Sequence, residues 1–205
     1  MAGTLFGEDG KGPTGAAMIR RDDQSIALRV KREAMKGARA AVIFDRDGVL
    51  NLDHGYVGEA ERFEWMTGAR GAIGRLNGRG VLVIVATNQS GVARGMFDMA
   101  AVEGIHDLMQ SQLAADGAHI DAFYVCPFHP NAVVQAYRHP DHPDRKPNPG
   151  MILRAMADWN IDPARAVLVG DKPRDIAAAT RAGIRGVLFP GGDVDAFLRD
   201  QGLAT

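Results

Sequence analysis

Residues 40–48 read AAVIFDRDG, an apolar run that ends in two aspartates separated by one residue. Four more short apolar runs follow, at residues 81–86, 122–126, 166–170 and 186–189. None of these runs alternates polar with apolar side chains. Both faces of each predicted strand should therefore be buried, as they are in a parallel sheet.

Helical patterns lie between the predicted strands. Their apolar residues recur three or four positions apart: Ala69, Ala72, Ile73 and Leu76; Val102, Ile105, Met109 and Leu113; Ile152, Ala155, Met156 and Trp159; Ile176, Ala177 and Thr180. Gly80 and Gly183 fall where helix C-caps are expected. Strands alternating with helices predict an α/β fold, with a doubly wound, open parallel sheet.

The chain of 205 residues is long enough for one ordinary domain. We expect residues 1–38 to form a partly flexible N-terminal extension, in which residues 20–36 permit one amphipathic helix. Residues 39–205 should form a single domain. The inserts at residues 51–64 and 127–149 follow predicted strands, and neither is large enough for a separate cap domain.

The overall charge argues against a nucleic-acid or membrane partner, because 24 basic and 25 acidic residues nearly cancel. The single cysteine, Cys126, fits a reducing compartment. No stretch approaches the roughly 20 apolar residues of a bilayer span, and the N-terminus lacks the apolar core of a signal peptide. We therefore expect a cytoplasmic protein without an obligate protein partner.

Polar side chains stand at the ends of the predicted strands. Asp45 and Asp47 follow the first strand, where buried carboxylates favour a hard cation such as Mg²⁺, although an Asx turn at Gly48 is the structural alternative. Residues 87–90, TNQS, follow the second strand and offer donors to an oxyanion, or else begin a helix.

Two later segments complete this pattern. Lys146 supplies a point charge suited to a phosphate. After the fourth strand, Asp171 could complete a metal site, and Asp175 could support it or orient Lys172. Each motif alone has an ordinary structural explanation, but a doubly wound sheet gathers its strand ends into one crevice. Together they predict a site that binds a metal and a phosphate.

This combination resembles the haloacid dehalogenase superfamily of aspartate-nucleophile phosphohydrolases over residues 41–192. Closer motifs are DRDGVLN at 45–51, DHGYV at 53–57, TNQSGVARG at 87–95, Cys126-Pro127 and RKPNPGM at 145–151. They resemble the D-glycero-D-manno-heptose 1,7-bisphosphate 7-phosphatases, and histidinol-phosphate phosphatases are the nearest related family. DHGY and ARG favour the heptose family.

The resemblance implies a Mg²⁺-dependent phosphatase that works through an aspartyl-phosphate. It makes Asp45 the nucleophile and Asp47 the general acid and base, and buried, anion-rich surroundings would favour a protonated Asp47. It also implies Mg²⁺ held by Asp45, the backbone carbonyl of Asp47 and Asp171. The first alternative is a phosphatase of histidinol phosphate or another small molecule. The further alternative is a catalytically silent binding protein on the same fold, against which the intact acidic set argues.

Substrate contacts are also implied. They fall on Thr87, Asn88, Gln89, Ser90 and Lys146 for the reacting phosphate, and on Asp53, His54, Gly55 and Tyr56 for the sugar. Arg145 is expected to bind the second phosphate, because a guanidinium can hold it with two hydrogen bonds.

The family often carries a structural zinc in the second insert, but most of the matching ligands are absent here. Cys126, His129, His139 and His142 could form a replacement set. The alternative is a metal-free loop stiffened by prolines, and we expect no structural zinc.

Overall fold

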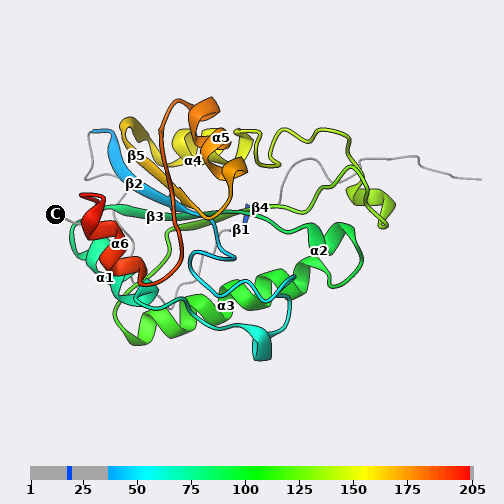
Figure 1. The fold of residues 1–205 in the computed structure, drawn as a ribbon, viewed down its shortest axis with the longest axis horizontal. Helices are drawn as coiled ribbons and strands as arrows, with labels where there is room; N and C mark the ends of the chain where they lie inside the picture. The colour runs from blue at the N-terminus through cyan, green and yellow to red at the C-terminus, as the bar shows by residue number, and fades with distance from the viewer. Residues whose placement is uncertain (1–17, 20–36, 204–205) are drawn as a thin grey trace, which may run out of the picture.

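A parallel sheet lies at the centre of the protein (Figure 1). The computed structural model describes residues 18–19 and 37–203. The parallel strands are β2 (Arg39–Phe44), β3 (Leu82–Asn88), β4 (Ala122–Cys126), β5 (Ile161–Gly170) and β6 (Arg185–Leu188). They lie in the order β4-β3-β2-β5-β6, and β1 (Met18–Ile19) pairs antiparallel with β4 at one edge.

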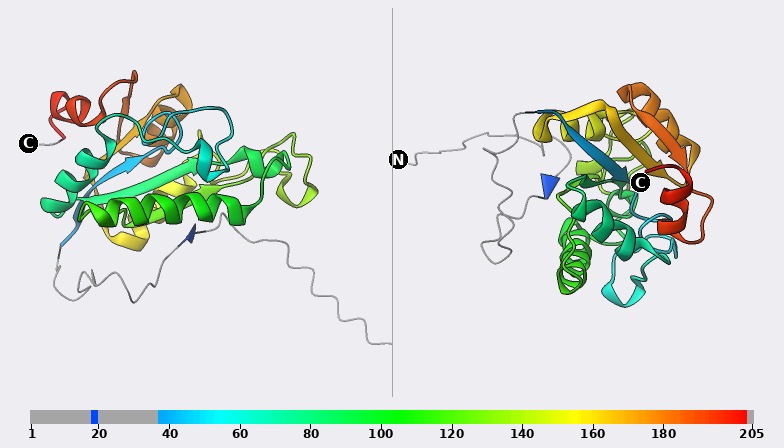
Figure 2. Two further views of the ribbon diagram at one scale, coloured as in Figure 1. Left: turned by 90° about the horizontal axis from the view of Figure 1, so that it is seen from below. Right: turned by 90° about the vertical axis from the view of Figure 1, so that its left-hand side faces the viewer.

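Helices cover both faces of this sheet (Figures 1 and 2). One face packs against α1 (Ala69–Gly78), α3 (Met99–Ala115) and α6 (Val194–Asp200). The other packs against α4 (Gly150–Trp159) and α5 (Pro173–Ala182). The predicted doubly wound α/β fold is confirmed.

Strand β2 shows how the sequence makes the two layers. Val42 and Phe44 belong to the cluster beneath α1 and α3, whereas Ala41 and Ile43 belong to the cluster beneath α4 and α5. All four side chains are almost completely buried. A strand covered on both faces has no polar positions along it, which explains the continuous apolar run.

The two inserts contain no helix longer than three residues. The first holds the 3₁₀ turn η2 (Ala60–Arg62), and the second holds η3 (Gln135–Tyr137). A short helix, α2 (Ser90–Ala93), follows β3. The two inserts therefore form no separate cap domain, as their size predicts.

Some elements differ from the expectation. Strand β5 begins at Ile161, five residues before the predicted run, because Ile161 already pairs with Arg39 of β2. The register between β5 and β2 then shifts, and the residues between the two pairings form an exposed bulge. Strand β1 lies inside the predicted extension. Helix α2 begins at Ser90, within the residues where a helix start was the alternative interpretation, and α6 was not predicted. The predicted helix over residues 20–36 lies outside the described residues, and the division at residue 38 stays a prediction.

The predicted helix ends agree with the backbone. Gly80 has a φ of 69° two residues after α1, and Gly183 has a φ of 75° at the C-cap of α5. None of the helices in residues 37–203 has both the length and the apolar character needed to cross a membrane.

Candidate active site

The polar strand ends surround one pocket of about 310 Å³ at the carboxyl edge of the sheet. This is the lower end of the range for small-ligand sites. The predicted site residues that line it are Asp45, Asp47, Asp53, Gly55, Tyr56, Asn88, Gln89, Ser90 and Lys172. Gly91 and Arg174 also line it and were not predicted.

Asp45 lines this pocket and follows β2 directly. Its Oδ1 accepts a hydrogen bond from the backbone N–H of Arg46 at 2.8 Å. Its Oδ2 lies 3.0 Å from Nζ of Lys146, and only 4% of the residue is exposed. Burial raises the pKa of Asp45 to about 6, although the charge of Lys146 opposes this shift.

Lys146 is buried beneath Asp45 and does not line the pocket. Its Nζ also lies 2.8 Å from Oδ1 of Asp175. Burial lowers the pKa of Lys146, but the two carboxylates outweigh burial and raise it. The side chain of Asn88 accepts from the Lys146 backbone N–H at 3.1 Å and donates to its carbonyl at 3.0 Å, which joins this loop to the end of β3.

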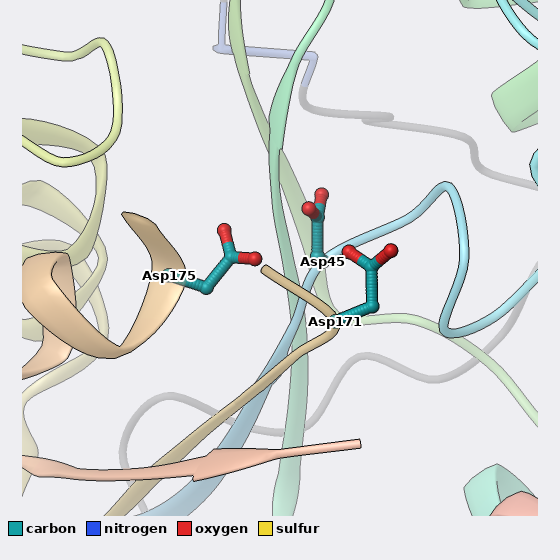
Figure 3. A group of neighbouring side chains, drawn as sticks. All are labelled: Asp45, Asp171 and Asp175. Carbon is teal, nitrogen blue, oxygen red and sulfur yellow. The ribbon is translucent and has the colours of Figure 1, made fainter. Parts of the chain in front are cut away.

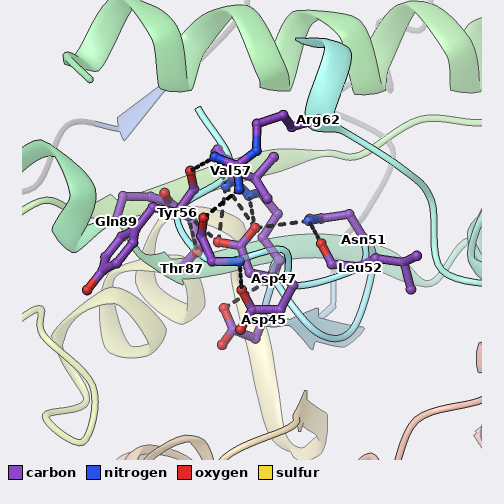
Figure 4. Close-up of polar contacts among 12 residues, drawn as sticks. Asp45, Asp47, Asn51, Leu52, Tyr56, Val57, Arg62, Thr87 and Gln89 are labelled. Carbon is purple, nitrogen blue, oxygen red and sulfur yellow. Dashed lines mark hydrogen bonds and ion pairs between the residues drawn. The ribbon is translucent and has the colours of Figure 1, made fainter. Parts of the chain in front are cut away.

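Asp47 is surrounded by hydrogen-bond donors (Figure 4). Arg46 donates to Oδ1 from Nε at 3.1 Å and from Nη2 at 2.8 Å. Asn51 donates to Oδ1 at 3.0 Å, and Gln89 donates to Oδ2 at 2.8 Å. We expected anion-rich surroundings, and this expectation was wrong because the buried side chain of Arg46 folds back onto its neighbour.

Three aspartates converge at the predicted metal position (Figure 3). Carboxylate oxygens of Asp45, Asp171 and Asp175 all lie within 4.8 Å of one another. Asp171 Oδ1 is buried and accepts no hydrogen bond from the described residues. A Cβ at Gly48 would collide with the Asp171 carboxylate, so this glycine lets the acid approach the Asp47–Gly48 turn. Such oxygen donors fit a hard divalent cation.

Asp175 lies in this acidic group and contacts the backbone of Lys172, and it also pairs with Lys146, which we did not predict. Its Oδ2 accepts the Lys172 backbone N–H at 3.0 Å at the start of α5, and its other oxygen contacts Lys146. The side chain of Lys172 instead pairs with Asp171, 2.6 Å from Oδ2. Asp175 therefore supports Lys146, and Asp47 contributes no side-chain oxygen to the aspartate group.

The predicted sugar-binding loop is held by a residue outside it. Arg62 of η2 donates to the backbone carbonyls of residues 54–56. His54 does not line the pocket, and its Nε2 lies 3.6 Å from a carboxylate oxygen of Glu64. Arg94, in the ARG motif, places its guanidinium 5.7 Å from the ring centre of Tyr56.

Thr87 and Arg145 lie near the pocket without lining it. Thr87 is buried, and its hydroxyl accepts from Gln89 Nε2 at 2.9 Å. Arg145 donates from Nη1 to the Phe128 carbonyl at 2.9 Å. The guanidinium that lines the pocket is Arg174, and its position within the DKPRD stretch after β5 was the signal that we missed.

Each of the three histidines of the second insert makes the same kind of side-chain turn. In each, Nδ1 accepts the backbone N–H two residues on, at 3.0 Å in His129, 3.2 Å in His139 and 3.1 Å in His142. A metal ion at any of these Nδ1 atoms would have to displace that hydrogen bond. Burial raises the pKa of Cys126 to about 12. The absence of a structural zinc stays a prediction from the sequence.

Known proteins share this fold and these motifs. A family model described as HAD-hydrolase-like matches residues 144–199. The D-glycero-beta-D-manno-heptose-1,7-bisphosphate 7-phosphatase of Rhodopseudomonas palustris is 45% identical over 162 residues, which cover 78% of this chain and 89% of the relative. The enzyme of the same name from Escherichia coli K12 is 42% identical over 70% of this chain and 75% of its own.

Solved structures agree with these relatives. A D,D-heptose 1,7-bisphosphate phosphatase from B. bronchiseptica, in complex with magnesium and phosphate, has a TM-score of 0.67 and 37% identity, covering 80% of this chain and 88% of its own. A HAD-like phosphatase from Mesorhizobium loti has a TM-score of 0.75 and 32% identity, covering 86% of this chain and 80% of its own. The chain therefore belongs to the D-glycero-D-manno-heptose-1,7-bisphosphate 7-phosphatase family of HAD-like hydrolases.

Proposed function

We propose that the protein is a Mg²⁺-dependent phosphomonoesterase that removes the 7-phosphate of D-glycero-D-manno-heptose 1,7-bisphosphate. One observation carries the proposal: a buried carboxylate, Asp45, stands at the pocket floor between a buried lysine and a second acid with an unpaired oxygen. Binding proteins have no need of this costly arrangement, whereas a phosphate-attacking nucleophile does.

In the first step, an Asp45 carboxylate oxygen attacks phosphorus. A bond forms between this oxygen and phosphorus, and the bond between phosphorus and the C7 oxygen breaks. Asp47 donates a proton to the departing oxygen. Hydrogen bonds from Arg46, Asn51 and Gln89 hold the Asp47 carboxyl group in one orientation. A fixed orientation is what a general acid needs to deliver its proton to the departing oxygen.

In the second step, water attacks the phosphorus of the aspartyl-phosphate and Asp47 takes up its proton. The bond between phosphorus and Asp45 breaks, which releases inorganic phosphate and restores the carboxylate. The donors around Asp47 satisfy its ionised form, which is the form this step requires. This step leaves Asp47 protonated, which is the form that the first step of the next turnover requires.

The metal site draws on the same residues. Asp45, Asp171 and the Asp47 carbonyl would hold Mg²⁺, which reduces repulsion between the anionic nucleophile and the anionic phosphate. Lys146 holds Asp45 in place and supplies positive charge beneath the phosphate, and Thr87 contributes a hydroxyl.

The test is a panel of substrates with and without Mg²⁺. Heptose 1,7-bisphosphate of both anomers should give the highest kcat/KM, ahead of sugar monophosphates and histidinol phosphate. Addition of EDTA should abolish turnover. A higher kcat/KM for histidinol phosphate would overturn the substrate assignment, and turnover that is independent of metal would overturn the mechanism.

We also infer a cytoplasmic location, where a phosphorylated sugar is available and the free thiol of Cys126 stays reduced. The absence of nucleic-acid, membrane and obligate protein partners stays a prediction from the balanced charge.

A further inference from the structure

Asp47 is connected to the first insert by two side chains that each make two contacts (Figure 4). Nη2 of Arg46 donates to Oδ1 of Asp47 at 2.8 Å and to the backbone carbonyl of Val57 at 2.9 Å. Nδ2 of Asn51 donates to the same Oδ1 at 3.0 Å and to the backbone carbonyl of Leu52 at 2.8 Å. Leu52 and Val57 enclose a loop that lines the pocket, so the Asp47 carboxyl group is tied to both ends of that loop.

Arg46 is the longer of these two connections. Its side chain is completely buried, which is costly for a charged group unless its hydrogen bonds are made. Nε and Nη2 bond to Asp47 and Val57, whereas Nη1 makes no hydrogen bond with the described residues. A planar guanidinium holds its donors in a fixed fork. Displacement of the Val57 carbonyl would therefore turn the group whose donors orient Asp47.

The loop of residues 53–56, between these two carbonyls, has a backbone that needs support. Tyr56 has a φ of 53°, in the left-handed region that bulky side chains rarely adopt. Such a conformation persists only where its surroundings hold it. Asp53, Gly55 and Tyr56 line the pocket, so the strained backbone is part of the site.

Arg62 supplies this support from outside the pocket. Its guanidinium donates to three successive backbone carbonyls, those of His54 at 2.7 Å, Gly55 at 3.0 Å and Tyr56 at 3.3 Å. Arg62 is exposed and does not line the pocket, so its contacts serve the loop and not the substrate directly. The last of the three carbonyls belongs to the residue before Val57.

We propose that Arg62 is a positioning residue for Asp47: it holds the loop of residues 53–56, and Arg46 transmits the position of this loop to the carboxyl group. The inference rests on the proposed function, in which Asp47 gives its proton to the departing oxygen as the bond to phosphorus breaks. Because the same loop lines the pocket, contact with the sugar and delivery of the proton are coupled through Arg46. A displaced loop leaves the acid poorly oriented.

The kinetic test compares two small substrates that differ in the basicity of the departing oxygen. Phenyl phosphate releases a more basic oxygen than p-nitrophenyl phosphate and depends more on a general acid, and neither carries a sugar that could contact the loop. For Arg62→Met, kcat/KM for phenyl phosphate should fall about tenfold more than kcat/KM for p-nitrophenyl phosphate. A general structural defect would lower both values by the same factor. A ratio of the two values within about twofold of the wild type would overturn the proposal.

Arg185→Met is the matched control. Arg185 is also an exposed arginine that donates to a backbone carbonyl, that of Gln201, but it does not line the pocket and contacts no residue of the loop. It should leave the ratio unchanged. A fall in the ratio as large as that of Arg62→Met would show that the effect is unspecific and would refute the proposal.

A double-mutant cycle tests the route through Arg46. In an Arg46→Lys background the fork between Asp47 and Val57 is lost, so adding Arg62→Met should lower the ratio no further. An equal fall in both backgrounds would show that Arg62 acts without Arg46, which contradicts the inference.

An NMR measurement separates this inference from the proposed function. The Nε–H of Arg46 donates to Asp47 at 3.1 Å inside the protein, so it should exchange slowly with water, and its resonance is identified by its loss in Arg46→Lys. Arg62→Met should accelerate this exchange about tenfold, whereas Arg185→Met should not. If the wild type hydrolyses none of these phosphate esters but the exchange depends on Arg62, the proposed function fails and the connection stands. If Arg62→Met leaves the exchange unchanged, the inference is wrong.

Discussion

Replacing Lys146 with methionine should destabilise the protein strongly, because it leaves two buried carboxylates without their cation. Nζ lies 3.0 Å from Asp45 Oδ2 and 2.8 Å from Asp175 Oδ1, and only 1% of the lysine is exposed. Removing one partner of a buried ion pair costs about 3–5 kcal/mol. We therefore expect Lys146→Met to lower the free energy of unfolding by about that amount at pH 8.

The pH dependence of this loss has a definite sign. Unpaired buried carboxyls have folded-state pKa values above the ordinary value of 3.8, as Asp45 already does with its pKa of about 6. Their penalty is present in full above the folded-state pKa and disappears as the pH falls toward the unfolded-state value. The difference between Lys146→Met and the wild type should therefore be smaller at pH 5 than at pH 8.

The assay is urea unfolding of metal-free protein, followed by tryptophan fluorescence at both pH values. Lys172→Met is the matched control, because Lys172 pairs with Asp171 but its side chain is 46% exposed. It should lose no more than about 1 kcal/mol. A loss for Lys146→Met within that control range, or one that is equal at both pH values, would refute the buried ion-pair argument.

Three further predictions concern the metal and the nucleophile. Asp45→Asn should abolish turnover and flatten the pH dependence of stability in metal-free protein. The pKa of about 6 rather than 3.8 makes the free energy of unfolding of the wild type fall by about 3 kcal/mol as the pH rises through that interval. If urea unfolding from pH 4 to 7 gives the same pH dependence of stability for both proteins, this prediction is wrong. Asp171→Ala should raise the Mg²⁺ concentration for half-maximal activity by roughly tenfold or more, since losing even a group that only supports a metal ligand costs about that much. Overlapping Mg²⁺ titrations for Asp171→Ala and the wild type would remove Asp171 from the metal site. Cys126→Ser should keep its fold and its Mg²⁺-dependent activity. Elemental analysis of the dialysed wild-type protein should find no stoichiometric zinc. One zinc per wild-type chain, with both the zinc and thermal stability lost in Cys126→Ser, would show that our interpretation of the second insert is wrong.

The sequence predicts the sheet well because burial on both faces leaves a continuous apolar run. Asp45, Thr87 and Asp171 could be placed at strand ends by counting from those runs, and the fold brings their strands side by side. The elements that were missed have weaker signals. Strand β1 has two residues, and the first part of β5 is a largely exposed bulge.

The partners of the charged side chains could not be predicted in the same way. Position along a strand does not say which way a long side chain turns, and Arg46 turns back to Asp47 instead of reaching solvent. Lys146 reaches Asp175 only because a loop distant in sequence packs beside the first turn of α5. That Arg174 lines the pocket could be recognised only from the structure.

The most direct test of the account is ³¹P NMR of heptose 1,7-bisphosphate incubated with the protein and Mg²⁺. The account predicts that the C7 phosphate resonance disappears, the C1 phosphate resonance persists, and inorganic phosphate grows in equal amount. No such change should occur with Asp45→Asn. Loss of the C1 phosphate first, or no loss of either phosphate under conditions in which the wild type hydrolyses histidinol phosphate, would contradict it.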